Sequence, residues 1–279
     1  MRRLPLAFFA CIAVAACQQS ETTASAHQNA ASAAGEPTGT ASAGATGSAA
    51  AKPASGEARE VNVENDLYSF QFSYPAAAAA IPELKDWFDG RITTQQRDLE
   101  KMATEMRDAA KKEGFPYRAF GEWSDWQVVT ELPEWLSLSA TVGTYTGGAH
   151  PNHSFKALLW DKQAKLIRQP VDLFLSKQAL AGAVRTDFCR ILDQQRAKKR
   201  GGAASLGSYD SFSDCIDPFE GQLILGSSTG KTFNRIGFLV PPYAAGPYAE
   251  GDYEVTLPVT EPIVSAVKPE YRQFFTVIR

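Results

Sequence analysis

The stretch LSLSATVGTYTGGAHPNHSFKALL, Leu136 to Leu159, decides the fold predicted for this chain. Its first and last parts alternate apolar and polar residues, which is the period of a strand with one buried face. Gly147 and Gly148 separate the two runs, and glycine permits the positive φ angles of a tight strand connection. The stretch therefore predicts an antiparallel hairpin.

Similar patterns occur elsewhere in the chain. Residues 68–74, 236–240 and 253–257 alternate in the same way, so further half-buried strands are predicted there. Two longer segments, Pro82 to Lys112 and about Lys177 to Lys199, carry apolar residues at helical spacing. Together these patterns predict an α+β fold in which two main helices cover a mostly antiparallel sheet.

The N-terminal residues indicate export. A basic start, an apolar run of about a dozen residues and small residues before Cys17 form the pattern of a cleaved signal. VAAC, Val14 to Cys17, resembles the bacterial lipoprotein signal, which implies that Cys17 is acylated, with palmitate, and becomes the mature N-terminus. Secretion without a lipid is the alternative. Gln18 is typical of sorting to the outer membrane, so we expect a lipid-anchored envelope protein that faces the periplasm.

Composition divides the chain into three parts. Residues 1–17 form the predicted signal peptide. Residues 18–58 are almost entirely small or polar and cannot bury enough apolar surface to offset the entropy of ordering, so we interpret them as a tether. Residues 59–279 are long enough for one large domain or for two subdomains, about 59–132 and 133–279.

The charge balance bears on partners. The formal net charge is -3 at pH 7. Nucleic acid is therefore not expected as a partner, because its binding needs a concentrated basic face. One dense basic run, Arg196 to Arg200, lies where the second helix would end. We interpret it as cations that complement the helix dipole.

Cysteine usage agrees with export. Cys189 and Cys215 are the two cysteines of residues 59–279, and an exported compartment permits disulfides. We expect these two residues to be bonded, which would close a loop of roughly 25 residues. Two separate buried thiols are the alternative.

Two segments rich in glycine and tyrosine carry a family resemblance. YTGGAH, Tyr145 to His150, is followed by PVDLF, Pro170 to Phe174, and then by FLVPPYAAGPYAEGDYEVTLP, Phe238 to Pro258. In this order, over about Glu60 to Gln273, they resemble the domain shared by the lysozyme-sensing anti-sigma factor RsiV and the non-catalytic part of the peptidoglycan deacetylase PdaC. The resemblance implies an extracytoplasmic α+β domain whose role is binding, and in the anti-sigma factor it is a receptor for lysozyme. This chain departs from both relatives, since we expect neither a transmembrane signalling segment nor a deacetylase catalytic domain in it.

The connection in the opening hairpin holds two histidines, His150 and His153. A zinc site needs three or four ligands, so neither a metal nor another cofactor is predicted. A structural turn in which His150 bonds nearby backbone is one interpretation, and an exposed recognition loop is the other.

The proline-rich loop before residue 253 is the second candidate region. Tyr243 and Tyr248 in a stiff loop offer contact area at low entropic cost, although covering the end of the core would explain them equally well. We interpret nearby acids such as Glu250 as solvated. The predicted binding residues are Tyr145, Gly147, Gly148, His150, Tyr243 and Tyr248.

No catalytic residue is predicted. GSSTG, Gly226 to Gly230, fits the nucleophile string G-x-S-x-G, but a strand pattern follows it and no histidine comes after His153. We expect it to join two strands, Gln222–Leu225 and Phe233–Val240. The predicted function is that of an envelope lipoprotein that binds either a protein or peptidoglycan. Among proteins, a lysozyme-like muramidase is the most specific hypothesis. A hydrolase acting on the cell wall is the alternative, because carboxylate pairs meet in space rather than in sequence.

Overall fold

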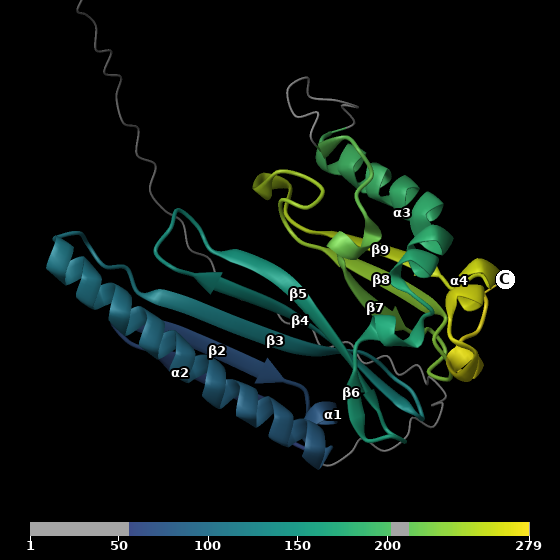
Figure 1. Ribbon diagram of the computed structural model, residues 1–279, viewed down its shortest axis with the longest axis horizontal. Coiled ribbons are helices and arrows are strands. Elements are labelled where there is room, and N and C mark those ends of the chain that lie inside the picture. The colour runs from purple at the N-terminus through teal and green to yellow at the C-terminus, as the bar shows by residue number, and fades with distance from the viewer. Residues whose placement is uncertain (1–55, 202–211, 279) are drawn as a thin grey trace, which may run out of the picture. The chain divides into compact units, whose positions relative to one another are not determined.

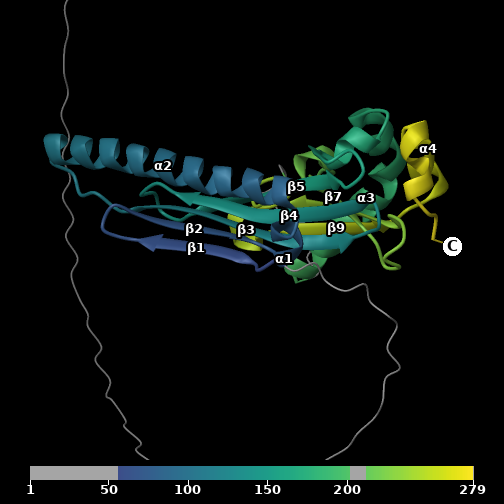
Figure 2. The same cartoon turned by 90° about the horizontal axis from the view of Figure 1, so that it is seen from below.

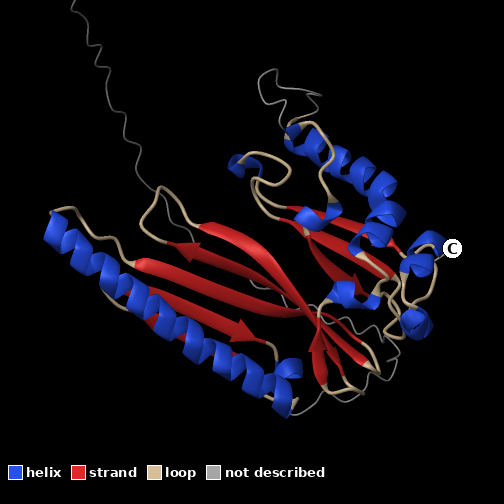
Figure 3. Cartoon of the chain, viewed as in Figure 1, coloured by secondary structure: helices blue, strands red, loops and turns tan. Residues whose placement is uncertain are grey.

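The computed structural model describes residues 56–201 and 212–278, and the predicted signal with Cys17, like the tether up to residue 55, lies outside them. The described residues form two sheets with helices packed on them (Figure 1, Figure 3). The predicted α+β fold is confirmed, with the difference that the strands form two sheets.

The first sheet has six strands in the order of the sequence. They are β1 (Arg59–Glu64), β2 (Tyr68–Tyr74), β3 (Phe120–Glu131), β4 (Trp135–Tyr145), β5 (Asn152–Asp161) and β6 (Leu166–Arg168). Neighbours are antiparallel except β2 and β3, which are parallel. A parallel pair needs a long crossover connection, and α1 (Ala76–Ala79) and α2 (Pro82–Glu113) form it.

The second sheet has three antiparallel strands, β7 (Gln222–Gly226), β8 (Arg235–Val240) and β9 (Tyr253–Pro258). GSSTG thus lies at the predicted hairpin connection between β7 and β8. The helices of this part are α3 (Lys177–Lys199) and α4 (Glu261–Ala266), together with the short 3-10 helices η1 (Pro170–Leu173), η3 (Pro218–Glu220), η4 (Tyr248–Glu250) and η5 (Pro269–Phe274).

Both predicted long helices are confirmed. Pro82 opens α2, where its missing N–H costs nothing, and Gly114 ends it with φ 78°, a conformation that glycine adopts without strain. The hydroxyl of Ser176 caps α3 by accepting a hydrogen bond from the Ala179 amide at 3.0 Å.

Helix α2 lies along one face of the six-stranded sheet (Figure 2), and one hydrophobic cluster lies between them. The four aromatic residues of β2 face the helix because they alternate along the strand, and the ring of Tyr74 stacks on that of Phe88 with centroids 4.8 Å apart. Burying a phenylalanine contributes roughly 1.5 to 3 kcal/mol, so this row fixes the helix on the sheet.

A second cluster lies among α3, the three-stranded sheet and the C-terminal segment. It includes Trp135 of β4 and Leu159 of β5, whereas their neighbours Leu136 and Leu158 belong to the first cluster. Strands β4 and β5 therefore bury both of their faces along part of their length. The division into subdomains at about residue 132 stays a prediction, with β4 and β5 contributing to both clusters.

None of the helices within residues 56–201 and 212–278 combines the length and the apolar composition required to cross a membrane.

The expected disulfide between Cys189 and Cys215 is confirmed, with Cα atoms 5.4 Å apart. Cys189 belongs to α3, and Cys215 precedes η3. The bond therefore holds the chain that follows the helix against the helix itself.

Removing this disulfide should destabilise the domain. A double variant, Cys189→Ala with Cys215→Ala, should lower the free energy of unfolding by about 3 kcal/mol, because the bond restricts the unfolded chain over a loop of this length. Denaturant unfolding without reductant measures the difference. Reductant should lower the stability of the wild type and leave the double variant unchanged. Equal stability of the wild type and the double variant in the absence of reductant would contradict this account.

Candidate functional site

The β4–β5 connection is a structured turn. Gly147 has φ 86°, in the region that favours glycine. The Tyr145 hydroxyl donates a hydrogen bond to the Gly148 carbonyl at 3.0 Å, and the Arg118 guanidinium donates to the same oxygen at 3.4 Å. These bonds hold the backbone of the turn, so the residues that follow it leave in a defined direction.

The turn contacts the loop between β8 and β9 through an aromatic cluster, which we define as His150, Tyr243 and Tyr248. The His150 and Tyr248 rings are stacked, with centroids 4.0 Å apart and planes inclined by 24°. The Tyr243 ring lies 5.5 Å from that of Tyr248 and 6.4 Å from that of His150. Tyr243 remains 52% exposed. Residues about a hundred positions apart in sequence thus form one exposed ring surface.

Both ring nitrogens of His150 are engaged. Nδ1 lies 2.9 Å from the Pro151 carbonyl, and because a carbonyl only accepts, Nδ1 carries the hydrogen. Nε2 then accepts from the Tyr243 hydroxyl at 3.3 Å. The Tyr248 hydroxyl also donates to the Pro151 carbonyl, at 3.0 Å. His150 thus bonds nearby backbone, as one of the two interpretations predicted, and the imidazole is held by hydrogen bonds on both edges.

Tyr243 has φ 70°, which is unusual for a residue with a side chain. Such a conformation costs on the order of 1 kcal/mol or more and persists only where the surroundings impose it. Prolines 241, 242 and 247 restrict the loop on either side of Tyr243. The strained backbone of Tyr243 carries an exposed aromatic ring. Strained backbone conformations of this kind are concentrated at functional sites.

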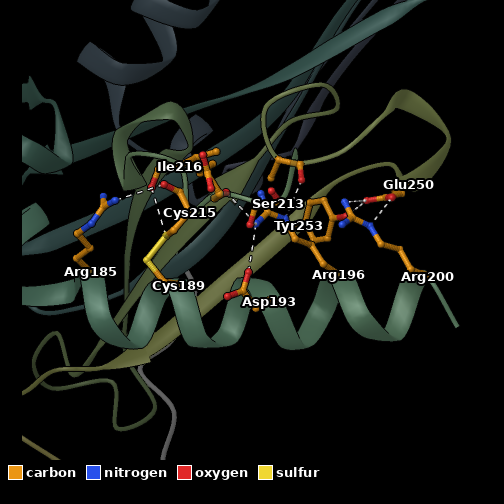
Figure 4. Close-up of polar contacts among 12 residues, drawn as sticks. Arg185, Cys189, Asp193, Arg196, Arg200, Ser213, Cys215, Ile216, Glu250 and Tyr253 are labelled. Atoms are coloured by element: carbon orange, nitrogen blue, oxygen red, sulfur yellow. Dashed lines mark hydrogen bonds and ion pairs between the residues drawn. A yellow bond between two sulfur atoms is a disulfide. The ribbon is translucent and has the colours of Figure 1, made fainter. Parts of the chain in front are cut away.

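The C-terminal end of α3 holds the tyrosine loop, which we define as residues 241–252 (Figure 4). The buried Arg196 donates to the Ala245 carbonyl at 2.9 Å and to that of Asp214 at 3.0 Å. Lys199 donates to the carbonyls of Glu250 and Asp252. The basic run is therefore a set of hydrogen-bond donors for the loop, beyond the complement to the helix dipole that the sequence suggested.

Arg200 and Glu250 form a bidentate ion pair between the end of α3 and the tyrosine loop. Their N–O distances are 2.8 and 3.1 Å, and each side chain is only 14% exposed. The Tyr253 hydroxyl also donates to Glu250. The interpretation of Glu250 as a solvated acid was wrong, because the loop folds back onto a helix some fifty residues earlier in the chain.

The electrostatics of this pair follow from its burial. Burial raises the pKa of Glu250, but the hydrogen bonds from Arg200 and Tyr253 and the charges of Arg200 and Lys199 outweigh it and leave that pKa below the usual glutamate value. The bond to Glu250 raises the pKa of Arg200. Burial and the bond to Glu250 raise the pKa of Tyr253 to about 12.

A second link ties the hairpin to the tyrosine loop. His153 Nε2 lies 2.7 Å from a carboxylate oxygen of Asp252. His153 is thus a connector between β5 and the loop. No group of three or more His, Cys, Asp or Glu residues that could hold a metal ion occurs in the part of the chain that the structure describes.

An open groove of about 540 Å³ adjoins the turn. Gly147 and Gly148 line it together with Met106, Phe115 and Arg118. Met106 and Phe115 are each 43% exposed. All six predicted binding residues therefore belong to the turn or to the loop stacked on it, and an apolar groove adjoins them.

Part of this chain is similar to a known protein family. The family described as Deacetylase PdaC matches residues 61–153. The inferred resemblance to the PdaC domain is confirmed there, and the matched segment contains the turn, whereas the tyrosine loop lies beyond it. The PdaC family is extracytoplasmic and associated with the cell envelope, so a cell-wall-related domain is supported.

Two solved structures are similar to this chain, both of DUF3298 family proteins. One, from Pseudomonas aeruginosa PAO1, is 13% identical with a TM-score of 0.43, over 77% of this chain and 96% of that one. The other, from Bacteroides fragilis, is 16% identical with a TM-score of 0.42, over 77% of this chain and 98% of that one. No curated protein matches the chain.

The Glu250 contact predicts a pH-dependent stability. Glu250→Gln should lower the free energy of unfolding at pH 7 by about 2 kcal/mol, the scale of a hydrogen bond to a charged group. Because the folded pKa of Glu250 is below its ordinary value of 4.5, the carboxylate stabilises the fold above that pH, and the contribution is lost as pH falls through the folded pKa.

Unfolding of both proteins by denaturant between pH 7 and pH 3 measures the effect. The two stability curves should converge at the acid end. Glu113→Gln, at an exposed position in the last turn of α2, is the matched control and should follow the wild type throughout. A gap between Glu250→Gln and the wild type that stays constant down to pH 3 would show that the loss has another cause.

Proposed function

We propose that this chain is a cell-envelope lipoprotein whose folded domain binds its ligand and does not catalyse a reaction. The binding surface is formed by the turn and the tyrosine loop, that is, by Tyr145, Gly147, Gly148, His150, Tyr243 and Tyr248. No cofactor takes part in this proposal.

The aromatic cluster is the observation that carries the proposal. Its rings are held before any ligand arrives, since His150 is bonded on both edges and Tyr248 is bonded to Pro151. A surface fixed in advance loses little entropy on binding, and tyrosine is enriched among the residues that dominate interfaces. The ion pair of Arg200 and Glu250 fixes the loop from behind.

The proposed ligand is a protein of the envelope, and a lysozyme-like muramidase is the first candidate because the resembling anti-sigma domain is a lysozyme receptor. The apolar groove that adjoins the turn, with Met106 and Phe115, supports a protein ligand. Peptidoglycan is the second candidate. The observation in its favour is the match to the family described as Deacetylase PdaC, because the matched residues include the turn.

Anchoring is the second part of the proposal. Residues 1–17 supply the argument, because the VAAC sequence ends at Cys17 with the spacing of a lipoprotein signal. The proposed location is the outer membrane, facing the periplasm.

Cys17→Ser tests the anchor. The variant should be released from the membrane fraction and should not undergo lipoprotein-type cleavage, because the acyl acceptor is gone. Fractionation and the mass of the N-terminal peptide measure both effects. Cys11→Ser, within the apolar run, should leave fractionation unchanged. A Cys17→Ser protein that still sediments with membranes and is processed as before would contradict lipidation.

Tyr248→Ala tests the binding surface. The variant should weaken binding to lysozyme, or else to purified peptidoglycan, by on the order of 1 to 3 kcal/mol, because a stacked interface tyrosine is lost. Calorimetry measures lysozyme binding and pelleting measures peptidoglycan binding. Leu175→Ala, at a position 54% exposed and outside the surface, is the control. Unchanged binding of a folded Tyr248→Ala protein would contradict the proposed surface.

The same proteins test the hydrolase alternative. If the purified domain degrades peptidoglycan, and His150→Ala or Glu250→Gln abolishes turnover without changing binding, the domain is an enzyme and the present proposal is wrong.

A further inference from the structure

A polar groove lies beside α2, on the face of the six-stranded sheet that the helix covers. Its volume is about 250 Å³. Three neighbouring strands supply its floor in matched positions, since Glu122 of β3 pairs with Thr144 of β4, which pairs with Asn152 of β5. We define the groove by its polar side chains, which are Gln95, Glu122, Ser124, Thr144, Asn152, Ser154 and Lys156.

The groove exists because the sheet face changes character along β4 and β5. Towards one end the face is apolar, and Leu138 and Leu158 are buried in the cluster under α2. Towards the β4–β5 turn, the same face carries Thr144, Asn152 and Lys156, all of them exposed. Helix α2 packs on β2 and β3. The polar part of the sheet face therefore lies beside the helix and remains open as the groove.

The side chains of the groove lack protein partners. The Gln95 Oε1 atom is buried and accepts no hydrogen bond from the described residues. Within the same residues, Glu122, Asn152 and Lys156 make no side-chain hydrogen bond or ion pair. Buried polar groups in proteins are normally bonded, so the buried amide oxygen of Gln95 without a partner is exceptional, and Glu122 adds a half-buried carboxylate to the same groove.

The two charged groups of the groove, Glu122 and Lys156, interact through their charges but form no ion pair with each other. Burial raises the pKa of Glu122, the charge of Lys156 opposes that shift, and the charge of Asp98 on α2 adds to it. No ion pair closes between Glu122 and Lys156 in this part of the structure. The carboxylate and the ammonium therefore both remain available to a third group.

We propose that this groove binds a zwitterionic ligand of the size of an amino acid or dipeptide. The ligand ammonium lies against Glu122 and its carboxylate against Lys156, and the amides of Gln95 and Asn152 bind its polar backbone. A zwitterion supplies one partner for each of the two protein charges, whereas a neutral ligand pairs neither charge and an ion of either sign pairs one.

This site is independent of the proposed binding surface. Side chains alternate along β5, so Asn152, Ser154 and Lys156 project towards α2 while His153 projects to the opposite face. On that opposite face His153 bonds Asp252 of the tyrosine loop. A variant of the aromatic cluster should therefore leave the groove intact.

Four forms of one dipeptide test the proposal by calorimetry on the purified domain. They are alanyl-alanine, its N-acetyl form, its C-terminal amide, and the form capped at both ends, with the first in both the L and the D configurations. The zwitterion should bind best, and each cap should weaken binding about tenfold or more, as expected for the loss of a charge-assisted hydrogen bond.

Charge variants assign each end of the ligand. Glu122→Gln should weaken binding of the zwitterion and of the C-terminal amide about tenfold, while Lys156→Met should weaken binding of the zwitterion and of the N-acetyl form. Glu113→Gln and Lys112→Met, at exposed positions at the end of α2, are matched controls and should change nothing. Tyr248→Ala should retain dipeptide binding.

Three results would overturn the proposal. The first is that none of the dipeptide forms binds at millimolar concentration. The second is that an uncharged probe, either the doubly capped dipeptide or N-acetylglucosamine, binds as tightly as the zwitterion. The third is that both charge variants keep full affinity while melting as the wild type does.

Discussion

The burial of both faces of β4 and β5 is the constraint on which the rest of the structure depends. A strand that is covered on one side can place polar residues on the other, but these two strands supply Leu136 and Leu158 to the cluster under α2 and Trp135 and Leu159 to the cluster under α3. The two layers of helix and sheet are thereby attached to the same pair of strands. The turn at the far end of this pair consequently has a defined position relative to both layers.

The tyrosine loop shows how such a surface can be stiff without being part of a sheet. Its backbone carbonyls are bound by Arg196 and Lys199, its acid Glu250 is bound by Arg200, and Tyr253 closes the contact from β9. Carbonyl groups of a loop would otherwise need water, and a helix end rich in cations satisfies them with charged donors. Tyr243 can then keep its left-handed backbone because the loop has little freedom to relax.

Much of this fold could be predicted from periodicity, and the exceptions have physical causes. Helices α2 and α3 and the hairpin follow local patterns, and the disulfide follows from the presence of two cysteines in an exported domain. Strand β3 did not stand out, because its α2-facing positions mix Phe120 and Trp126 with the polar residues Glu122 and Ser124. The interruption of the apolar pattern coincides with the polar groove, as expected where a functional feature conflicts with a local rule.

The contacts of Arg200 and Glu250 could not be predicted for a different reason. The two residues are separated by fifty positions, and nothing in either segment indicates that a loop returns to that helix end. The stacking of Tyr248 on His150 joins residues still further apart. The types of residue at the candidate site were visible in the sequence, whereas their partners depend on tertiary packing.

Gly143 affects both the polar groove and the contact of His153 with the tyrosine loop, which lie on opposite faces of β4 and β5. It pairs with Trp123 on one side and with His153 on the other, and a Cβ atom at this position would collide with the Trp123 indole. Only glycine lets the indole lie over the strand. Because a shift by one residue would bring Val142 or Thr144 under the indole, this contact opposes a register slip. Such a slip would turn Asn152 away from the groove and His153 away from Asp252, so one glycine helps to keep both surfaces on their own faces of the sheet.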